Sequence, residues 1–296
     1  MPMIGRFGVV GCAMVTPFNP SGELDVDAAV TLAKWLCENG NDFLVLAGTT
    51  GESPSLSDSE KDDLWRAVTS ALTVPVIAGT STADTAHSVE LTKMARHAGA
   101  AGILAVTPYY NRPSQAGIEA HIRAIAEAAG ELPVLLYDIP VRTGRKVSQD
   151  VIVRLARDDV IAGVKDATGN PAASAALIAE APGGFELYSG NDADTLALLA
   201  LGAVGTISVE SHWAGELVAE MISAFWKGDL DRAREANARL IPSHQFQSSE
   251  DAPNPVPAKA MLRVLGQKAG NCRLPMGVEP EGLEDRARRV FDQLHG

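Results

Sequence analysis

A lysine ends one of the apolar runs of the chain, where burial could turn its amine into a nucleophile. Residues 161–164 are apolar or glycine, and Lys165 and Asp166 follow directly. Burial lowers the pKa of an amine from about 10.4, and the neutral amine can attack a carbonyl carbon to form a Schiff base. A structural salt bridge between Lys165 and Asp166 is the alternative interpretation. Lys165 is therefore a candidate for imine chemistry.

Two tyrosines, Tyr110 and Tyr137, follow the two apolar runs that precede the run of the lysine. A phenol hydroxyl beside an imine-forming lysine can move the protons that dehydration of a carbinolamine requires. Thr49 or Thr50, which follow another run, could connect the two phenols by hydrogen bonds. A single tyrosine is commonly an amphipathic residue at the edge of a core. Together, Lys165, Tyr110 and Tyr137 on three neighbouring strands favour a site that transfers protons.

Two further features could bind carboxylates. The glycines of the GTTG sequence at residues 48–51 let backbone N–H groups approach an anion closely. Arg142 lies just after the fifth apolar run, where its guanidinium could hold a second carboxylate by two parallel hydrogen bonds. Each signal is weak alone, because a lone arginine is commonly a solvated loop charge.

The cysteines and histidines do not form a metal-binding pattern. Cys12, Cys37 and Cys272 are far apart and odd in number, which favours reduced structural thiols. The absence of a histidine cluster disfavours a metal-dependent mechanism, and we expect no cofactor. Only His212 could face the site, although capping of the following helix is the favoured interpretation.

Eight short apolar runs must position these residues. The runs do not alternate polar with apolar residues, which indicates strands buried on both faces, as in parallel sheets. Helical patterns lie between the runs, with a capping box at residues 57–60 and a glycine at a helix end, Gly40. Eight βα units at this spacing predict a (β/α)8 TIM barrel rather than a doubly wound sheet. The runs begin near Val9, Phe43, Val74, Gly102, Pro133, Ile161, Phe185 and Gly205.

The pattern becomes purely helical after the eighth run. We expect residues 1–210 to hold the barrel strands and most of its helices, and residues 211–296 to hold the final barrel helix and a C-terminal helical appendage. The appendage helices are predicted at residues 216–226, 230–241, 258–265 and 284–294. Residues 248–257 contain three prolines and should form an irregular connection.

Charge and hydropathy exclude several classes of partner. The formal net charge of −12 argues against a nucleic-acid surface, which requires clustered lysine and arginine. No apolar run approaches the ~20 residues of a membrane span, and residues 1–6 are too few for a signal peptide. We therefore expect a cytoplasmic protein that acts on small molecules and contacts neither nucleic acid nor membrane.

Several motifs resemble those of the dihydrodipicolinate synthase family, and the likeness extends over nearly the whole chain. They are GTTGE at residues 48–52, YYNRP at 109–113, YDIPVRTG at 137–144, GVKDATG at 163–169, NPVPAK at 254–259 and RLPM at 273–276. The resemblance implies a lyase of lysine and diaminopimelate biosynthesis, acting by a class I aldolase mechanism. Such an enzyme condenses pyruvate with L-aspartate 4-semialdehyde to 4-hydroxy-tetrahydrodipicolinate.

The resemblance also implies roles for individual residues. Lys165 would form the pyruvate imine, and Tyr137, Thr49 and Tyr110 would transfer protons. In the family, the tyrosine matching Tyr110 enters the site of a neighbouring subunit, which implies a homotetramer built as a dimer of dimers. The implied substrate-binding residues are Thr50, which with Thr49 would hold the pyruvate carboxylate, Gly190 and Ile207 in the pocket wall, and Arg142 for the semialdehyde carboxylate.

The chain departs from the family pattern at several positions. His87 and Lys61 stand where lysine-inhibited members have Glu and His, so we expect weak or absent inhibition by lysine. Asn191 replaces a common Asp, and the stretch around His212 is more polar than usual. Both could retune the acceptor aldehyde.

Two other functions remain open from the sequence. Lys165 and Tyr137 would serve equally in an aldolase, lyase or dehydratase for sialic acid or keto-sugar acids, although Arg142 favours a carboxylate-bearing acceptor. A non-catalytic barrel that binds a keto acid is the other alternative. It is disfavoured because every expected catalytic position is filled.

Overall fold

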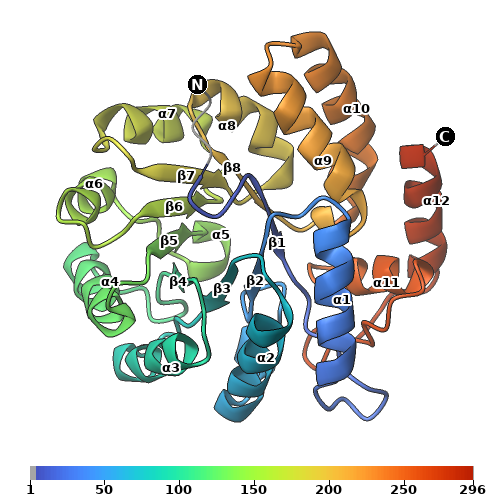
Figure 1. Cartoon of the computed structure of the whole chain (residues 1–296), viewed down its shortest axis with the longest axis horizontal. Coiled ribbons are helices and arrows are strands. Elements are labelled where there is room, and N and C mark those ends of the chain that lie inside the picture. The colour runs from blue at the N-terminus through green and yellow to red at the C-terminus, as the bar shows by residue number, and fades with distance from the viewer. Residues whose placement is uncertain (1–4, 296) are drawn as a thin grey trace.

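The computed structural model describes residues 5–295 and contains a closed barrel of eight parallel strands (Figure 1). Residues 1–4, which form most of the segment considered as a signal peptide, and residue 296 lie outside the described part. The strands follow one another around the barrel in chain order, and β1 pairs with β8 to close it. The predicted (β/α)8 barrel is confirmed. The strands are β1 (Val10–Ala13), β2 (Phe43–Leu46), β3 (Val76–Gly79), β4 (Gly102–Val106), β5 (Val134–Asp138), β6 (Gly163–Asp166), β7 (Glu186–Ser189) and β8 (Gly205–Ser208).

Side chains of each strand alternate between the inside of the barrel and the helical layer. On β5, Leu135 and Tyr137 belong to the cluster that fills the barrel, whereas Val134 and Leu136 pack with the helices. This alternation follows from the two-residue period of an extended chain. It explains why the strands are apolar throughout, since both faces are covered.

The helices of the barrel surround the strands. Helix α2 begins with the predicted capping box, in which Ser57 Oγ accepts a hydrogen bond from the Glu60 N–H and Glu60 Oε2 accepts one from the Ser57 N–H. Gly40 follows the end of α1 at a φ of +88°, a conformation that favours glycine. The helices up to β8 are α1 (Val26–Glu38), η1 (Ser53–Ser55), α2 (Asp58–Ala71), α3 (Thr85–His97), α4 (Gln115–Ala129), α5 (Pro140–Thr143), α6 (Gln149–Arg157), α7 (Pro171–Glu180), η2 (Asp192–Asp194) and α8 (Thr195–Leu201).

The C-terminal helices gather on one side of the barrel, beside α1 (orange to red in Figure 1). Two predicted helix boundaries are wrong by five residues: α9 begins at Ser211 instead of residue 216, and α10 continues through Pro242 to Phe246 instead of ending at Ile241. The turn after the proline is held by packing, because Ser243 is buried and its Oγ accepts a hydrogen bond of 2.8 Å from Trp213 Nε1. The division of the chain at residue 210 stays a prediction. These helices are α9 (Ser211–Trp226), α10 (Leu230–Phe246), α11 (Val256–Val264) and α12 (Leu283–His295).

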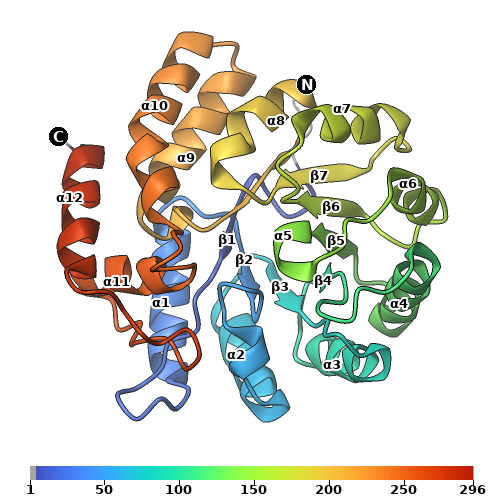
Figure 2. The same ribbon diagram turned by 180° about the vertical axis from the view of Figure 1, so that it is seen from behind.

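The carboxyl ends of β4, β5 and β6 lie side by side, as the sequence predicts. Val106 is in register with Tyr137, and Tyr137 with Lys165. Figure 2 shows the short α5, which follows β5, in the middle of the ring of helices. Among the described helices, none combines the length and the apolar character needed to cross a membrane.

Candidate active site

Lys165 and Tyr137 form the centre of the candidate site. Both side chains project inward from adjacent strands, and Lys165 Nζ lies 4.3 Å from the centroid of the Tyr137 ring. Both residues are buried, with 4% and 5% of their surface exposed. The alternative interpretation of Lys165 as a salt-bridge partner of Asp166 is wrong, because Asp166 points to the opposite face of β6. There its oxygens accept hydrogen bonds from Ser174 Oγ and from the Thr168 N–H.

Burial makes the amine of Lys165 a better nucleophile. Desolvation lowers its pKa to about 8, and the positive charge of Arg142 acts in the same direction, whereas the Asp192 carboxylate opposes them. Gly190 packs directly against the lysine stem: a Cβ at this position would lie 2.9 Å from Lys165 Cγ and 3.0 Å from Cε. A side chain at residue 190 would therefore displace the lysine.

Tyr137 keeps its proton at neutral pH. Burial raises the pKa of its phenol to about 12, and the charge of Arg142 and a side-chain interaction with Thr49 oppose this only partly. A protonated phenol beside an amine can donate a proton to a departing hydroxyl group. The structure thus brings together Lys165, Tyr137 and Thr49.

The loop after β2 offers two backbone N–H groups to a ligand. Within residues 5–295, the amides of Thr49 and Thr50 donate to no protein acceptor. Ala47 and Glu52, at either side of the loop, have positive φ values of 52° and 56°, which are uncommon for residues other than glycine. Such strain persists where the surroundings fix the backbone, and it is common at ligand-binding sites.

Residues from the C-terminal region fix this loop. Asn254 Nδ2 donates a hydrogen bond of 2.9 Å to Thr50 Oγ1. Glu52 forms an ion pair of 2.7 Å with Lys259 in which both side chains are almost completely buried, and it also accepts a hydrogen bond from the Arg273 N–H. The motifs at residues 254–259 and 273–276 therefore act on the site through the loop after β2.

A cavity of about 450 Å³ opens beside the loop and Tyr137. Thr49, Tyr137 and Arg142 line it. Lys165 is not among the lining residues, but its Nζ lies 4.3 Å from the centroid of the Tyr137 ring. Arg142 stands on α5, and its side chain is substantially exposed, so its guanidinium is available to a ligand. The cavity wall also contains Ser81, Tyr109, Ile139, Asn254, Arg273 and Met276.

Tyr110 is a predicted site residue that the structure does not bring to the others. Its side chain is 93% exposed. The Asn111 N–H bonds to the Tyr109 carbonyl oxygen at 2.9 Å, and Tyr110 between them has a φ of +71°, which describes a γ-turn. This rare and strained turn directs the tyrosine away from its own barrel.

The structure also places the remaining predicted residues. Ile207 is buried in the cluster that fills the barrel, together with Tyr137. His212 neither faces the cavity nor caps a helix: its Nε2 accepts a hydrogen bond from the Val15 N–H and its Nδ1 donates to the Val209 carbonyl oxygen. These bonds fix the neutral ring, and burial lowers its pKa to about 4. Asn191 donates to Asp194 at the surface.

Sequence reasoning missed the buried carboxylate of Asp192. Its Oδ2 accepts hydrogen bonds from the N–H groups of Val209 and Glu210, and its charge acts on Lys165. Asp192 lies just after the seventh strand, and Lys165 lies at the end of the sixth. A position at the carboxyl end of a barrel strand is the sequence signal that could have identified Asp192.

Comparison with known proteins agrees with this geometry. Residues 6–293 match the model of the dihydrodipicolinate synthetase family. The chain belongs to this family. It is 46% identical to 4-hydroxy-tetrahydrodipicolinate synthase of Acidothermus cellulolyticus, over 91% of this chain and 87% of the relative.

Two solved structures of family members are close to this fold. Dihydrodipicolinate synthase of Cyanidioschyzon merolae with lysine bound is 40% identical and has a TM-score of 0.95, with 98% of this chain and 99% of that chain covered. The chloride-inhibited enzyme of Acinetobacter baumannii complexed with pyruvate is 36% identical and has a TM-score of 0.92, with the same coverage. The resemblance seen in the motifs is therefore confirmed over the whole barrel and the C-terminal helices.

Proposed function

We propose that this member of the dihydrodipicolinate synthetase family condenses pyruvate with L-aspartate 4-semialdehyde through a Schiff base on Lys165. The observation that carries the proposal is the buried amine of Lys165, with its lowered pKa, beside the protonated phenol of Tyr137. At pH 7, a pKa of about 8 leaves about one amine in ten neutral, against roughly one in three thousand at an ordinary lysine pKa. The relative in Acidothermus cellulolyticus carries the name of this activity, which supports the same assignment.

The first half of the reaction forms the enamine. The neutral amine of Lys165 attacks the ketone carbon of pyruvate to give a carbinolamine, and Tyr137 donates a proton to the hydroxyl group that leaves as water. The resulting iminium ion withdraws electrons from the methyl group of pyruvate, so that a C3 proton can be removed and the enamine forms. Thr49, which interacts with the phenol, would return the proton to Tyr137.

The second half joins the two substrates. The enamine carbon attacks the aldehyde carbon of the semialdehyde, and the new alkoxide takes up a proton from the relay. The amine of the semialdehyde then attacks the imine carbon, closes the ring and displaces Lys165. The product is 4-hydroxy-tetrahydrodipicolinate, and the free lysine amine is regenerated.

Two groups would hold the carboxylates of the substrates. The free N–H groups of Thr49 and Thr50 suit the carboxylate of pyruvate, since backbone amides in a tight loop form an anion-binding concavity. Arg142 lines the same cavity and suits the carboxylate of the semialdehyde, because a guanidinium binds a carboxylate by two hydrogen bonds. Gly190 and Ile207 would limit the space around the imine.

Tyr110 would complete the relay in a second copy of the chain. A tyrosine that is 93% exposed on a strained turn is well suited to contribute to a neighbouring site. We therefore propose a dimer as the smallest active unit and a homotetramer of two such dimers as the full assembly. Light scattering at the assay concentration tests this, and a fully active monomer would contradict it.

Reductive trapping tests the imine. Pyruvate with borohydride should add about 72 Da, because imine formation expels water and reduction adds two hydrogens, and peptide mapping should place the adduct on Lys165. Lys165→Arg keeps the positive charge and should give no adduct. An adduct on another lysine, or none in the wild-type protein, would refute the assignment of the nucleophile.

A comparison of initial rates tests the acceptor. Condensation of pyruvate with L-aspartate 4-semialdehyde should exceed pyruvate release from sialic acid and from a panel of keto-sugar acids. If release were faster, the imine on Lys165 would stand, but the acceptor would be a sugar acid. Asn191 and the segment around His212 would then be the residues to exchange.

A further inference from the structure

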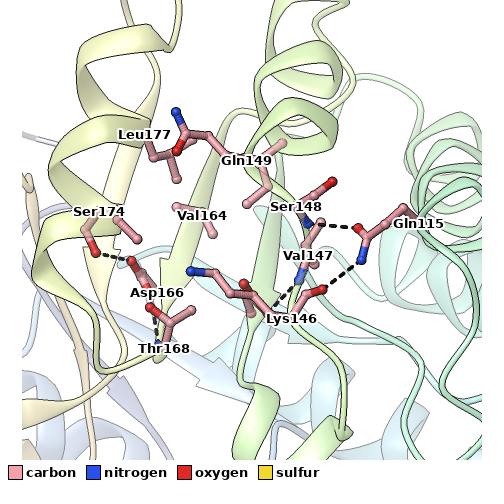
Figure 3. A pocket seen from close by; sticks show the side chains of 13 residues that line it. Gln115, Lys146, Val147, Ser148, Gln149, Val164, Asp166, Thr168, Ser174 and Leu177 are labelled. Atoms are coloured by element: carbon pink, nitrogen blue, oxygen red, sulfur yellow. Dashed lines mark hydrogen bonds between the residues drawn. The ribbon is translucent and has the colours of Figure 1, made fainter.

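A second pocket lies on the outer face of the strands that carry Tyr137 and Lys165. It has a volume of about 220 Å³ and opens between β5, β6 and the helices α6 and α7 (Figure 3). Asp138 and Asp166 line it, each one residue after a candidate catalytic residue and therefore on the opposite side of its strand. The pocket is thus separate from the cavity at the barrel mouth.

Two polar atoms in the pocket wall have no protein partner within the described residues. Asp138 is 1% exposed; its Oδ1 accepts a long hydrogen bond of 3.3 Å from the Val147 N–H, and its Oδ2 accepts none. The hydroxyl oxygen of Thr168 is likewise buried without a partner. A buried carboxylate oxygen without a donor is unfavourable, so this side chain is suited to a ligand that supplies one.

The other carboxylate and the amide of Gln115 in this wall already have partners. Both oxygens of Asp166 accept hydrogen bonds, from Ser174 and Thr168. Gln115 bonds to the Ser148 N–H and to the Lys146 carbonyl oxygen, as the dashed lines in Figure 3 show. Asp138 is therefore the group in this wall that still requires a donor.

The charges around the pocket favour a single positive charge. The Lys146 side chain reaches across the pocket toward Asp166 (Figure 3) but forms no ion pair in residues 5–295. With Asp138 ionised, the two carboxylates and one ammonium group leave a net charge of −1. Residues 5–295 contain no group of three His, Cys, Asp or Glu placed to hold a metal ion. An organic cation fits this wall better than a metal ion, since Val164, Ile152 and Leu177 supply an apolar side.

We propose that this outer pocket binds a small alkylammonium ion, whose charged head pairs with Asp138 Oδ2 and whose alkyl part packs against Val164, Ile152 and Leu177. The volume equals that of roughly seven water molecules, which leaves room for a chain of a few carbons. The proposal does not depend on the reaction at Lys165.

Binding should be stronger at higher pH. Burial raises the pKa of Asp138 to about 7, and the neighbouring Asp166 adds to this, while Lys146 opposes it. A cation favours the ionised carboxylate, so affinity should increase between pH 6 and pH 8. Asp166 and Lys146 are the other charged groups that line the pocket.

Calorimetric titration with n-propylammonium chloride tests the site, with sodium chloride at equal ionic strength as the reference. Saturable binding at pH 8 is expected, together with weaker binding at pH 6. Asp138→Asn should weaken binding by roughly ten- to a hundredfold, the effect of losing one charge-assisted hydrogen bond, and should remove the pH dependence. Asp150→Asn, on the same side of the barrel but exposed and outside the pocket, should bind as the wild type does.

A second variant locates the ligand without changing a charge. Ala173 lines the pocket on α7, and Ala173→Leu should fill the space of the alkyl group and abolish binding. This variant keeps the test valid if Asp138→Asn fails to fold. Absence of saturable binding in the wild type, or unchanged binding in Ala173→Leu, would overturn the proposal.

Discussion

Lys259→Met should destabilise the protein more than the double variant Glu52→Gln/Lys259→Met. The two side chains form an ion pair of 2.7 Å with exposed fractions of 2% and 0%. Loss of the lysine leaves the carboxylate of Glu52 buried without its cation, which costs about 3–5 kcal/mol. In the double variant no charge remains, and replacing a buried pair by neutral groups is often neutral or stabilising.

The contacts around the pair favour these substitutions. Methionine can keep the contact with the Phe18 ring, over which the ammonium of Lys259 lies at 4.1 Å, because a thioether packs well on aromatic rings. Glutamine at residue 52 can still accept the hydrogen bond from the Arg273 N–H. Besides the two charges, the double variant loses the hydrogen bond of 3.1 Å that Lys259 Nζ donates to the Asn271 carbonyl oxygen.

Thermal unfolding measures the difference. At about 2 °C per kcal/mol for a chain of this size, Lys259→Met should lower Tm by about 6–10 °C, and the double variant should recover most of that loss. Equal losses in Glu52→Gln, Lys259→Met and the double variant would mean that packing, not charge, holds the pair. A double-variant loss equal to the sum of the single losses would show no coupling and refute the reasoning.

Three further predictions concern the site. The rate of adduct formation with limiting pyruvate and cyanoborohydride should rise roughly fiftyfold from pH 6 to pH 8, because the amine of Lys165, with a pKa of about 8, loses its proton over this range; a flat profile would contradict it. Arg142→Ala should raise KM for the semialdehyde by roughly ten- to a hundredfold, with Arg142→Lys intermediate. It should slow the trapping of pyruvate much less, through the loss of a positive charge that helps to lower the pKa of Lys165; an equal loss for both substrates would argue against a role specific to the acceptor. Lysine should inhibit weakly or not at all, because His87, paired with Asp58 at 2.9 Å, supplies no fixed negative charge, and Lys61 adds a positive one; a sub-millimolar inhibition constant would contradict this.

The barrel was predictable because its signals are local and repeated. Each strand is a short apolar run, and the capping box of α2 is complete within four residues. The end of α10 was not predictable, because the contact that carries the helix past Pro242 comes from Trp213 on another helix. Proline disfavours the interior of a helix, but the packing of side chains on both sides of Pro242 outweighs this preference.

The chemistry of the site was predictable in part. Lys165 and Tyr137 could be found because parallel strands place their carboxyl ends together. The neutral, structural role of His212 could not, since it depends on a backbone N–H from residue 15, far away in the sequence. The same holds for the buried partner of Glu52: a glutamate after a glycine-rich loop does not reveal which of the chain's lysines neutralises it.

The C-terminal region holds the loop after β2, so these contacts can form only late in the synthesis of the chain. Glu52 accepts its hydrogen bond from a backbone N–H 221 residues further along the chain. At the ordinary ~5–20 residues per second, the ribosome needs roughly 10–45 s to add that segment after the loop has been made. The nascent chain therefore contains strands β1 to β8 before the residues that hold the loop after β2 have been made. A chain that ended after the barrel would lack the contacts of Asn254, Lys259 and Arg273 that hold Thr50 and Glu52 in this loop.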